Sequence, residues 1–224
     1  MIIQYVLFAV FGLLGMLVQN RLKSKMEKYS QIPFLRGMTG AQVAKKMLEY
    51  YGIFDVQIVQ GGGFLSDHYN PTNKTVSLSQ GIYDGQSIAA AAVAAHECGH
   101  AVQHATAYSM LTMRSAMVPM VNIAASAQQF IWMAMILIAS PMMMFVAVLA
   151  FGVTTLFSLI TLPVEFDASR RALAWLDATG TLQGEEYAGA KDALWWAAMT
   201  YVVAALSAAA QFLYILMRYL GDRR

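Results

Sequence analysis

Residues 91–104 read AAVAAHECGHAVQH, and the HECGH stretch at 96–100 organises the rest of the chain. The alanine-rich run before it is a strong helix former, and Ser87 is a suitable N-cap for that helix. On a helix His96 and His100 are spaced i and i+4, so both imidazoles project from one face. The stretch therefore predicts a helix that carries two adjacent histidine ligands.

This spacing lets two ring nitrogens bind one zinc ion at about 2.0–2.1 Å. Glu97 lies one step round the helix, where its carboxylate reaches a water on the metal rather than the metal itself. The pattern is the HExxH arrangement of zinc-dependent peptidases, in which the glutamate acts as general base. Gly99 costs helix stability unless another backbone or the metal site approaches closely. Since three of the four histidines fall within residues 96–104, a metal site is favoured over a chance match.

The composition indicates an integral membrane protein. Of 224 residues, 58% are hydrophobic and only 12% are charged, which is not the profile of a soluble protein. A net charge of +2 is too small to suggest a nucleic acid partner. The single cysteine excludes an intrachain disulfide framework, so nothing in the sequence demands an oxidising compartment.

The sequence predicts a mainly α membrane protein with about four transmembrane helices. A small α+β zincin-like portion is expected to carry the HExxH helix. The uncharged run 117–162 is long enough for two crossings that turn near Ser140 and Pro141. The chain is thus divided into a first transmembrane helix (1–20), a catalytic segment (21–112), a transmembrane hairpin (117–162), a third-ligand helix with a polar loop (163–192), a fourth transmembrane helix (193–217) and a tail (218–224).

Lysine and arginine are unevenly distributed around the predicted spans. Nine lie in residues 21–116 and three in 163–192, whereas the tail carries three on the opposite side. By the positive-inside rule, the catalytic segment is expected to face the cytoplasm.

Within the catalytic segment, Thr39 is expected to cap an amphipathic helix that ends near Gly52, followed by an alternating strand at 54–60. A second alternating strand, if it lies at a sheet edge, would bind an extended peptide substrate through its backbone. An ordinary sheet strand is an equally open alternative. The residues of this candidate substrate strand are Lys74, Thr75, Val76, Ser77, Leu78 and Ser79.

Between the two strands lies SDHYNP at residues 66–71. His68 and Tyr69 are candidates for donating a hydrogen bond to a tetrahedral intermediate, and Asp67 is a candidate for orienting a zinc-bound histidine. The alternative is a turn, since aspartate, asparagine and proline favour turns without any catalytic role.

Zinc needs a third protein ligand, and Glu165 is a better candidate than His104. Along a straight helix His104 lies about 12 Å from His96, too far to share one ion. Glu165 follows the uncharged run, where Pro163 is expected to start a new helix, and would complete a His2Glu site with one open position. His104 and Asp167 are then candidates for contacting the ligands from behind.

Five blocks, SDHYNP, AAHECGHAVQH, RSAMVPMVNI, TLPVEFDASRRAL and ALWWAAMTYVVAAL, resemble the YugP-type family of bacterial membrane zinc metallopeptidases. The likeness runs in order from about Ser66 to Leu206. It implies one zinc ion bound by His96, His100 and Glu165, with Glu97 as base. The family looks like a relative of the gluzincins, including the HtpX-type membrane peptidases. Their pattern has an aspartate four residues beyond the glutamate ligand, where this chain has Ser169.

The expected function is therefore a membrane-anchored zinc endopeptidase of the bacterial cytoplasmic membrane, multi-pass, with its site facing the cytoplasm. Its expected partners are the lipid bilayer and a peptide or membrane-protein substrate, without nucleic acid. One rival is an intramembrane protease of the site-2 type. A second rival is a non-proteolytic zinc-binding scaffold or chaperone.

Overall fold

The computed structural model describes residues 2–63, 66–137 and 140–221, which form seven helices and one three-stranded sheet. In chain order the elements are α1 (Ile2–Ser30), α2 (Gly40–Tyr50), β1 (Gln57–Gly61), β2 (His68–Asn70), β3 (Thr75–Ser79), α3 (Gln80–Tyr83), α4 (Ile88–Ala105), α5 (Ser109–Leu137), α6 (Pro141–Ala178) and α7 (Gly184–Gly221).

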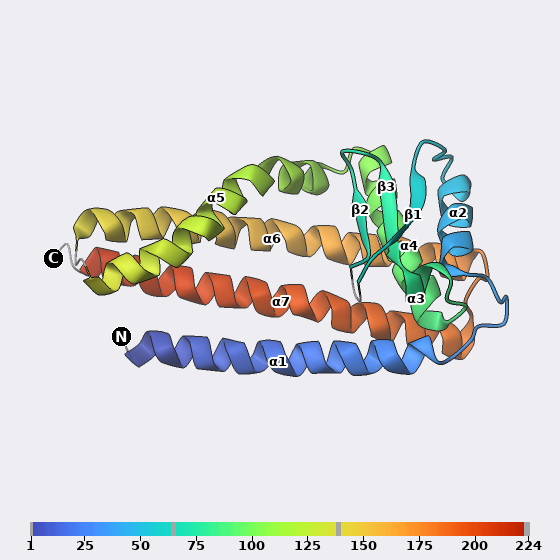
Figure 1. Ribbon diagram of the computed structural model, residues 1–224, viewed down its shortest axis with the longest axis horizontal. Coiled ribbons are helices and arrows are strands. Elements are labelled where there is room, and N and C mark those ends of the chain that lie inside the picture. Colours follow the sequence, from blue (N-terminus) through green and yellow to red (C-terminus); the bar gives the residue numbers. More distant parts are fainter. Residues whose placement is uncertain (1, 64–65, 138–139, 222–224) are drawn as a thin grey trace.

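Four long helices, α1, α5, α6 and α7, run side by side, and the sheet with α2, α3 and α4 gathers at one end of them (Figure 1). The beginning of α1, the end of α7, the end of α5 and the beginning of α6 all lie at the other end (Figure 1). A chain that leaves the sheet end along α5 therefore returns to it along α6. This is the geometry that a hairpin between HExxH and Glu165 requires.

The HExxH helix α4 lies at the centre of the sheet end. Ser87 caps it, because its side chain accepts a hydrogen bond from the Ala90 backbone N–H. Its alanines at 89–92, 94 and 95 are fully buried, and the small side chains let α2, α6 and α7 pack closely around it. A Cβ on Gly99 would lie 2.5 Å from the Ala168 carbonyl oxygen of α6, so of the two explanations for this glycine the structure supports close approach of another backbone.

The sheet corrects the prediction for residues 74–79. The strand order is β1-β3-β2, with β1 parallel and β2 antiparallel to β3, so β3 is the central strand and not an edge. Its backbone groups already pair with two neighbours and cannot also bind a substrate. An alternating pattern does not distinguish a central strand from an edge strand, because both bury one face. The edge nearest the HExxH helix is β2, which the sequence suggested to be a turn.

Three described helices, α1, α6 and α7, are long and apolar enough to cross a membrane. They correspond to three of the four predicted spans. α5, which begins at Ser109, is not among them within the described residues, so the fourth crossing stays a prediction. Its Gln128 is satisfied inside the bundle, donating to the Ala150 carbonyl and the Thr154 hydroxyl of α6.

The long helices continue beyond the apolar runs from which the spans were predicted, so helix ends and span ends do not coincide. α1 extends to Ser30, burying Leu22, Met26 and Tyr29 at helical spacing. α6 passes through Pro163 without ending, so no new helix starts there. A proline inside a helix loses one backbone hydrogen bond, which neighbouring packed helices can compensate.

The polar loop predicted within residues 163–192 is short, because α6 extends to Ala178 and α7 already begins at Gly184. Glu185 and Glu186 stabilise its first turn through the helix dipole. Gly189 is buried inside the helix, where a Cβ would lie 2.9 Å from the Tyr29 ring. Of the predicted tail, Arg218 lies in the last turn of α7, while Arg223 and Arg224 lie outside the described residues.

Candidate metal centre

Three side chains from two distant parts of the chain converge in the interior of the sheet end. The Oε2 atom of Glu165 lies 3.4 Å from Nε2 of His96 and 3.6 Å from Nε2 of His100. One ligand atom from each residue lies within 4.8 Å of the other two. The sequence predicted this set, and the antiparallel return of α6 beside α4 brings it together.

The geometry and chemistry of this cluster fit a zinc ion. Two atoms that each lie 2.0–2.1 Å from one tetrahedral ion are separated by about 3.4 Å, close to the observed spacings. Moreover, the Glu165 side chain is only 3% exposed, and its Oε2 atom lacks a hydrogen-bond partner in the described structure. A buried carboxylate oxygen without a partner is costly, and a metal ion would satisfy it.

The other oxygen of Glu165 is held by α5. Nη1 of Arg114 lies 3.0 Å from Oε1, an ion pair that leaves only Oε2 directed at the histidines. Arg114 thereby favours coordination through one oxygen and links α5 to the cluster.

His100 is oriented by Gln103, which is completely buried. Nδ1 of His100 donates to Oε1 of Gln103 at 3.0 Å, and the amide of Gln103 donates to the Val164 carbonyl and to Asp167 on α6. With the proton on Nδ1, Nε2 carries the lone pair that faces the cluster. Burial lowers the pKa of His100, but Glu165 more than offsets this and raises it, so the site attracts a cation.

His96 is oriented in the same way by a shorter side chain. Oγ of Ser169 lies 3.1 Å from Nδ1 of His96, so it accepts the ring proton and leaves Nε2 free. Ser169 thus occupies the place where the HtpX-type pattern has an aspartate. Cys98, between the two histidines, is fully buried on another face, and burial raises the pKa of its thiol, which makes it a poor ligand.

The predicted supporting residues have different positions from those expected. Asp67 accepts hydrogen bonds from the backbone and hydroxyl of Ser79 and so fixes the end of β3. Asp167 reaches His100 only through Gln103 and is also paired with Arg170 and Arg171. These contacts give both carboxylates a partner other than a histidine ligand.

His68 and Tyr69 lie on β2 beside the cluster but are engaged elsewhere. Nδ1 of His68 donates to the Ser66 carbonyl at 2.8 Å. The hydroxyl of Tyr69 is bonded to Nδ1 of His104 at 2.7 Å, and burial raises its pKa to about 12. His104, predicted to contact the ligands, therefore binds Tyr69, one or two helical turns away from them.

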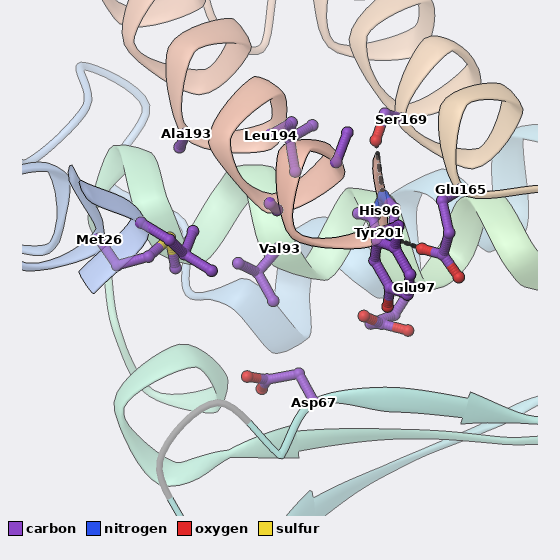
Figure 2. Close-up of a pocket in the computed structure, with 13 residues that line it drawn as sticks. Met26, Asp67, Val93, His96, Glu97, Glu165, Ser169, Ala193, Leu194 and Tyr201 are labelled. Carbon is purple, nitrogen blue, oxygen red and sulfur yellow. Dashed lines mark hydrogen bonds and ion pairs between the residues drawn. The ribbon is translucent and has the colours of Figure 1, made fainter. Parts of the chain in front are cut away.

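A mostly apolar cavity of about 120 Å³ opens from the cluster between α1, α4 and α7. Glu97 and Tyr201 line it, and a second cavity of about 360 Å³ shares both residues and extends toward β2. Figure 2 shows the carboxylate of Glu97 directed into this space, on the side of α4 that faces the strands. Glu97 therefore lies next to the cluster of His96, His100 and Glu165 without belonging to it.

A family model described as "Putative neutral zinc metallopeptidase" matches residues 4–220. The chain belongs to this family. A curated relative, "Putative membrane protease YugP" from Bacillus subtilis (strain 168), is 37% identical over 223 residues, covering 100% of this chain and 99% of the relative. No solved structure matches significantly. The family and the apolar helices together indicate a zinc protease of the membrane, in agreement with the resemblance found in the sequence.

The sequence did not predict a role at the site for four residues that lie there: Gln103, Arg114, Ser169 and Tyr201. Gln103 had a usable signal, because a residue at i+3 from His100 lies on the same helix face. Arg114 and Tyr201 had no such signal in the sequence, because only the packing of α5 and α7 brings them to the cluster. Ser169 was noticed as a departure from the HtpX-type pattern, but only its position in space shows what it contacts.

Proposed function

We propose that the chain is a membrane-anchored zinc endopeptidase that binds one zinc ion through His96, His100 and Glu165 and uses Glu97 as general base. The observation that carries this proposal is the convergence of the three ligand atoms within 4.8 Å, with Glu97 in the adjoining cavity. The family description and the YugP relative support the same activity.

When bound, zinc would act as a Lewis acid that polarises the scissile carbonyl and lowers the pKa of the attacking water. Glu97 takes a proton from that water and delivers it to the leaving amine. Gln103 and Ser169 hold the two rings in the orientation that binding requires. Tyr201, which lines both cavities, is the candidate for donating a hydrogen bond from its hydroxyl to the developing oxyanion.

The site is expected to lie at the membrane surface. Glu165 is about 24 residues, or about 36 Å, along α6 from Pro141, which exceeds the roughly 30 Å of hydrocarbon. We therefore expect substrates to be cut in extended segments next to a membrane span. The cytoplasmic orientation rests on the lysines and arginines of residues 21–116.

We propose that the substrate backbone lies along β2 instead of β3. In the described parts of the chain β2 pairs only with β3, and His68 and Tyr69 line the cavity that leads to the cluster. A peptide added at this edge would pass Glu97 and place one apolar side chain in the cavity beside Leu22 and Leu194.

The two rival functions are less consistent with the fold. The site-2 type places HExxH in a spanning helix, whereas α4 is enclosed by α2, the sheet, α6 and α7. A scaffold with a structural zinc needs no base, yet Glu97 lines the cavity next to the cluster.

The decisive experiment compares Glu97→Gln with Glu165→Ala in purified full-length protein. Glu97→Gln should retain zinc and lower cleavage of an unfolded probe, fluorescein-labelled casein, by about 10³-fold. Glu165→Ala should lose zinc as measured by metal analysis. Unchanged cleavage in Glu97→Gln would exclude the mechanism, and full zinc occupancy in Glu165→Ala would remove Glu165 from the ligand set. Glu27→Gln, an exposed change on α1, serves as the control.

A further inference from the structure

A further hollow, distinct from the two cavities at the metal cluster, lies between α6 and α7. It measures about 330 Å³ and is lined mainly by apolar surface. Apart from the small Ala174, its exposed residues are Phe166, Arg170, Lys191 and Trp195. Phe166 and Arg170 lie just beyond Glu165 on α6, at the expected membrane surface, so the medium against this face is expected to be the boundary between lipid headgroups and acyl chains.

The exposed residues occur in the same order on both helices. On α6, Arg170 lies one turn beyond Phe166 in the direction of the sheet end. On the antiparallel α7, Lys191 lies one turn beyond Trp195 in that same direction. The hollow therefore presents aromatic rings on its membrane side and two cations above them. This order matches a phospholipid, whose acyl chains and glycerol lie below an anionic phosphate.

Both cations have N–H groups available to bind an anion. Among the described residues Lys191 has no acidic partner within ion-pair distance. Arg170 is paired with Asp167 through Nη2, but its side chain is 77% exposed and the guanidinium has further N–H groups. A phosphate between α6 and α7 would complete both.

We propose that this hollow binds one anionic phospholipid, with its phosphate between Lys191 and Arg170 and its glycerol and upper acyl chains against Phe166 and Trp195. The site does not depend on the proposed protease activity. It adjoins the metal cluster, because Ser169, Leu194 and Ala198 line both this hollow and the cavity beside Glu97. A bound lipid therefore contacts the side chain that orients His96.

The test titrates full-length protein in neutral detergent micelles with phosphatidylglycerol or phosphatidylcholine that carries brominated acyl chains. Bromine quenches tryptophan on contact, and the difference between wild type and Trp195→Phe isolates the signal of Trp195. Half-quenching should occur at an about fivefold lower fraction of phosphatidylglycerol, the effect of about one basic side chain near a phosphate. Lys191→Gln should abolish this preference and Lys191→Arg should retain it.

A matched control is Lys23→Gln on α1, which removes another exposed cation, distant in sequence from the hollow. It should leave the preference unchanged. Equal quenching by both lipids, or an equal loss in Lys23→Gln, would overturn the proposal in favour of general surface charge. Displacement of phosphatidylglycerol by millimolar inorganic phosphate would also overturn it, because the hollow would then be a site for free phosphate.

Discussion

From Pro141 to Thr161, α6 lies between α5 and α7 and leaves several large apolar side chains exposed, among them Leu149, Leu156 and Leu159. From Val164 onward one face of the same helix is buried against α4, and Glu165, Asp167 and Ser169 on that face all make contacts with polar groups. One helix thus passes through two environments.

The difference shows how closely the position of each half of α6 must be fixed. In the apolar half, lipid can replace a missing protein neighbour, and contacts between flexible side chains tolerate small shifts. At the sheet end, the backbone of α6 touches the backbone of α4 at Gly99, and the positions of the proposed zinc ligands depend on that crossing. Equivalent changes in the two halves should therefore have unequal effects.

The largest difference is expected between Gly99→Ala and Gly152→Ala. The Cβ at position 99 would lie 2.5 Å from the Ala168 carbonyl oxygen, so the crossing must open by about 1 Å, whereas zinc ligands tolerate about 0.2 Å. Gly99→Ala should lose zinc and lower the free energy of unfolding by about 2 kcal/mol, more than the helix propensity that alanine adds. Metal analysis and thermal denaturation measure both.

At Gly152, a Cβ meets only the Phe212 ring, at 3.3 Å. That ring can move by a few tenths of an ångström, so Gly152→Ala should retain zinc and stay within about 1 kcal/mol of wild type. If the two alanine variants lost zinc to the same extent, the contrast between the two halves of α6 would be refuted.

A smaller difference is expected between Gln103→Leu and Gln128→Leu. Both glutamines donate to α6, but only Gln103 also accepts from His100, a proposed zinc ligand. Gln103→Leu should weaken zinc binding by about 10–100-fold in a chelator competition, the usual effect of losing a partner behind a metal ligand. Gln128→Leu should leave zinc affinity unchanged. A zinc affinity in Gln103→Leu that equals wild type would show that His100 needs no partner.

Much of the sheet end could be predicted because its signals are local. The HExxH spacing, the Ser87 cap and the capping box of Thr39 with Gln42 each involve residues close in sequence. Glu165 was also predictable, since a zinc site limits how often the intervening chain can cross the membrane. Its role as ligand stays a prediction.

The errors occurred where distant contacts decide the structure. Strand order depends on which strands pair, so residues 74–79 could not be distinguished as central. The ends of α1 and α7 depend on packing between them, as Tyr29 against Gly189 shows. Likewise, no local pattern connects Arg114 or Tyr201 to a carboxylate on another helix.

The smallest effect is expected for Ser169→Ala compared with Thr155→Val, two changes on α6 that each remove one hydroxyl. Ser169 accepts from His96, whereas Thr155 donates to the Ala208 carbonyl of α7. Loss of one hydrogen bond of about 1 kcal/mol should weaken zinc binding about fivefold in Ser169→Ala and leave it unchanged in Thr155→Val. Ser169→Asp should restore or exceed wild-type affinity, because a carboxylate accepts the His96 proton more strongly. An affinity of Ser169→Asp below that of Ser169→Ala would mean that the space beside His96 fits only a hydroxyl, and that this serine is kept for its size and not for its hydrogen bond.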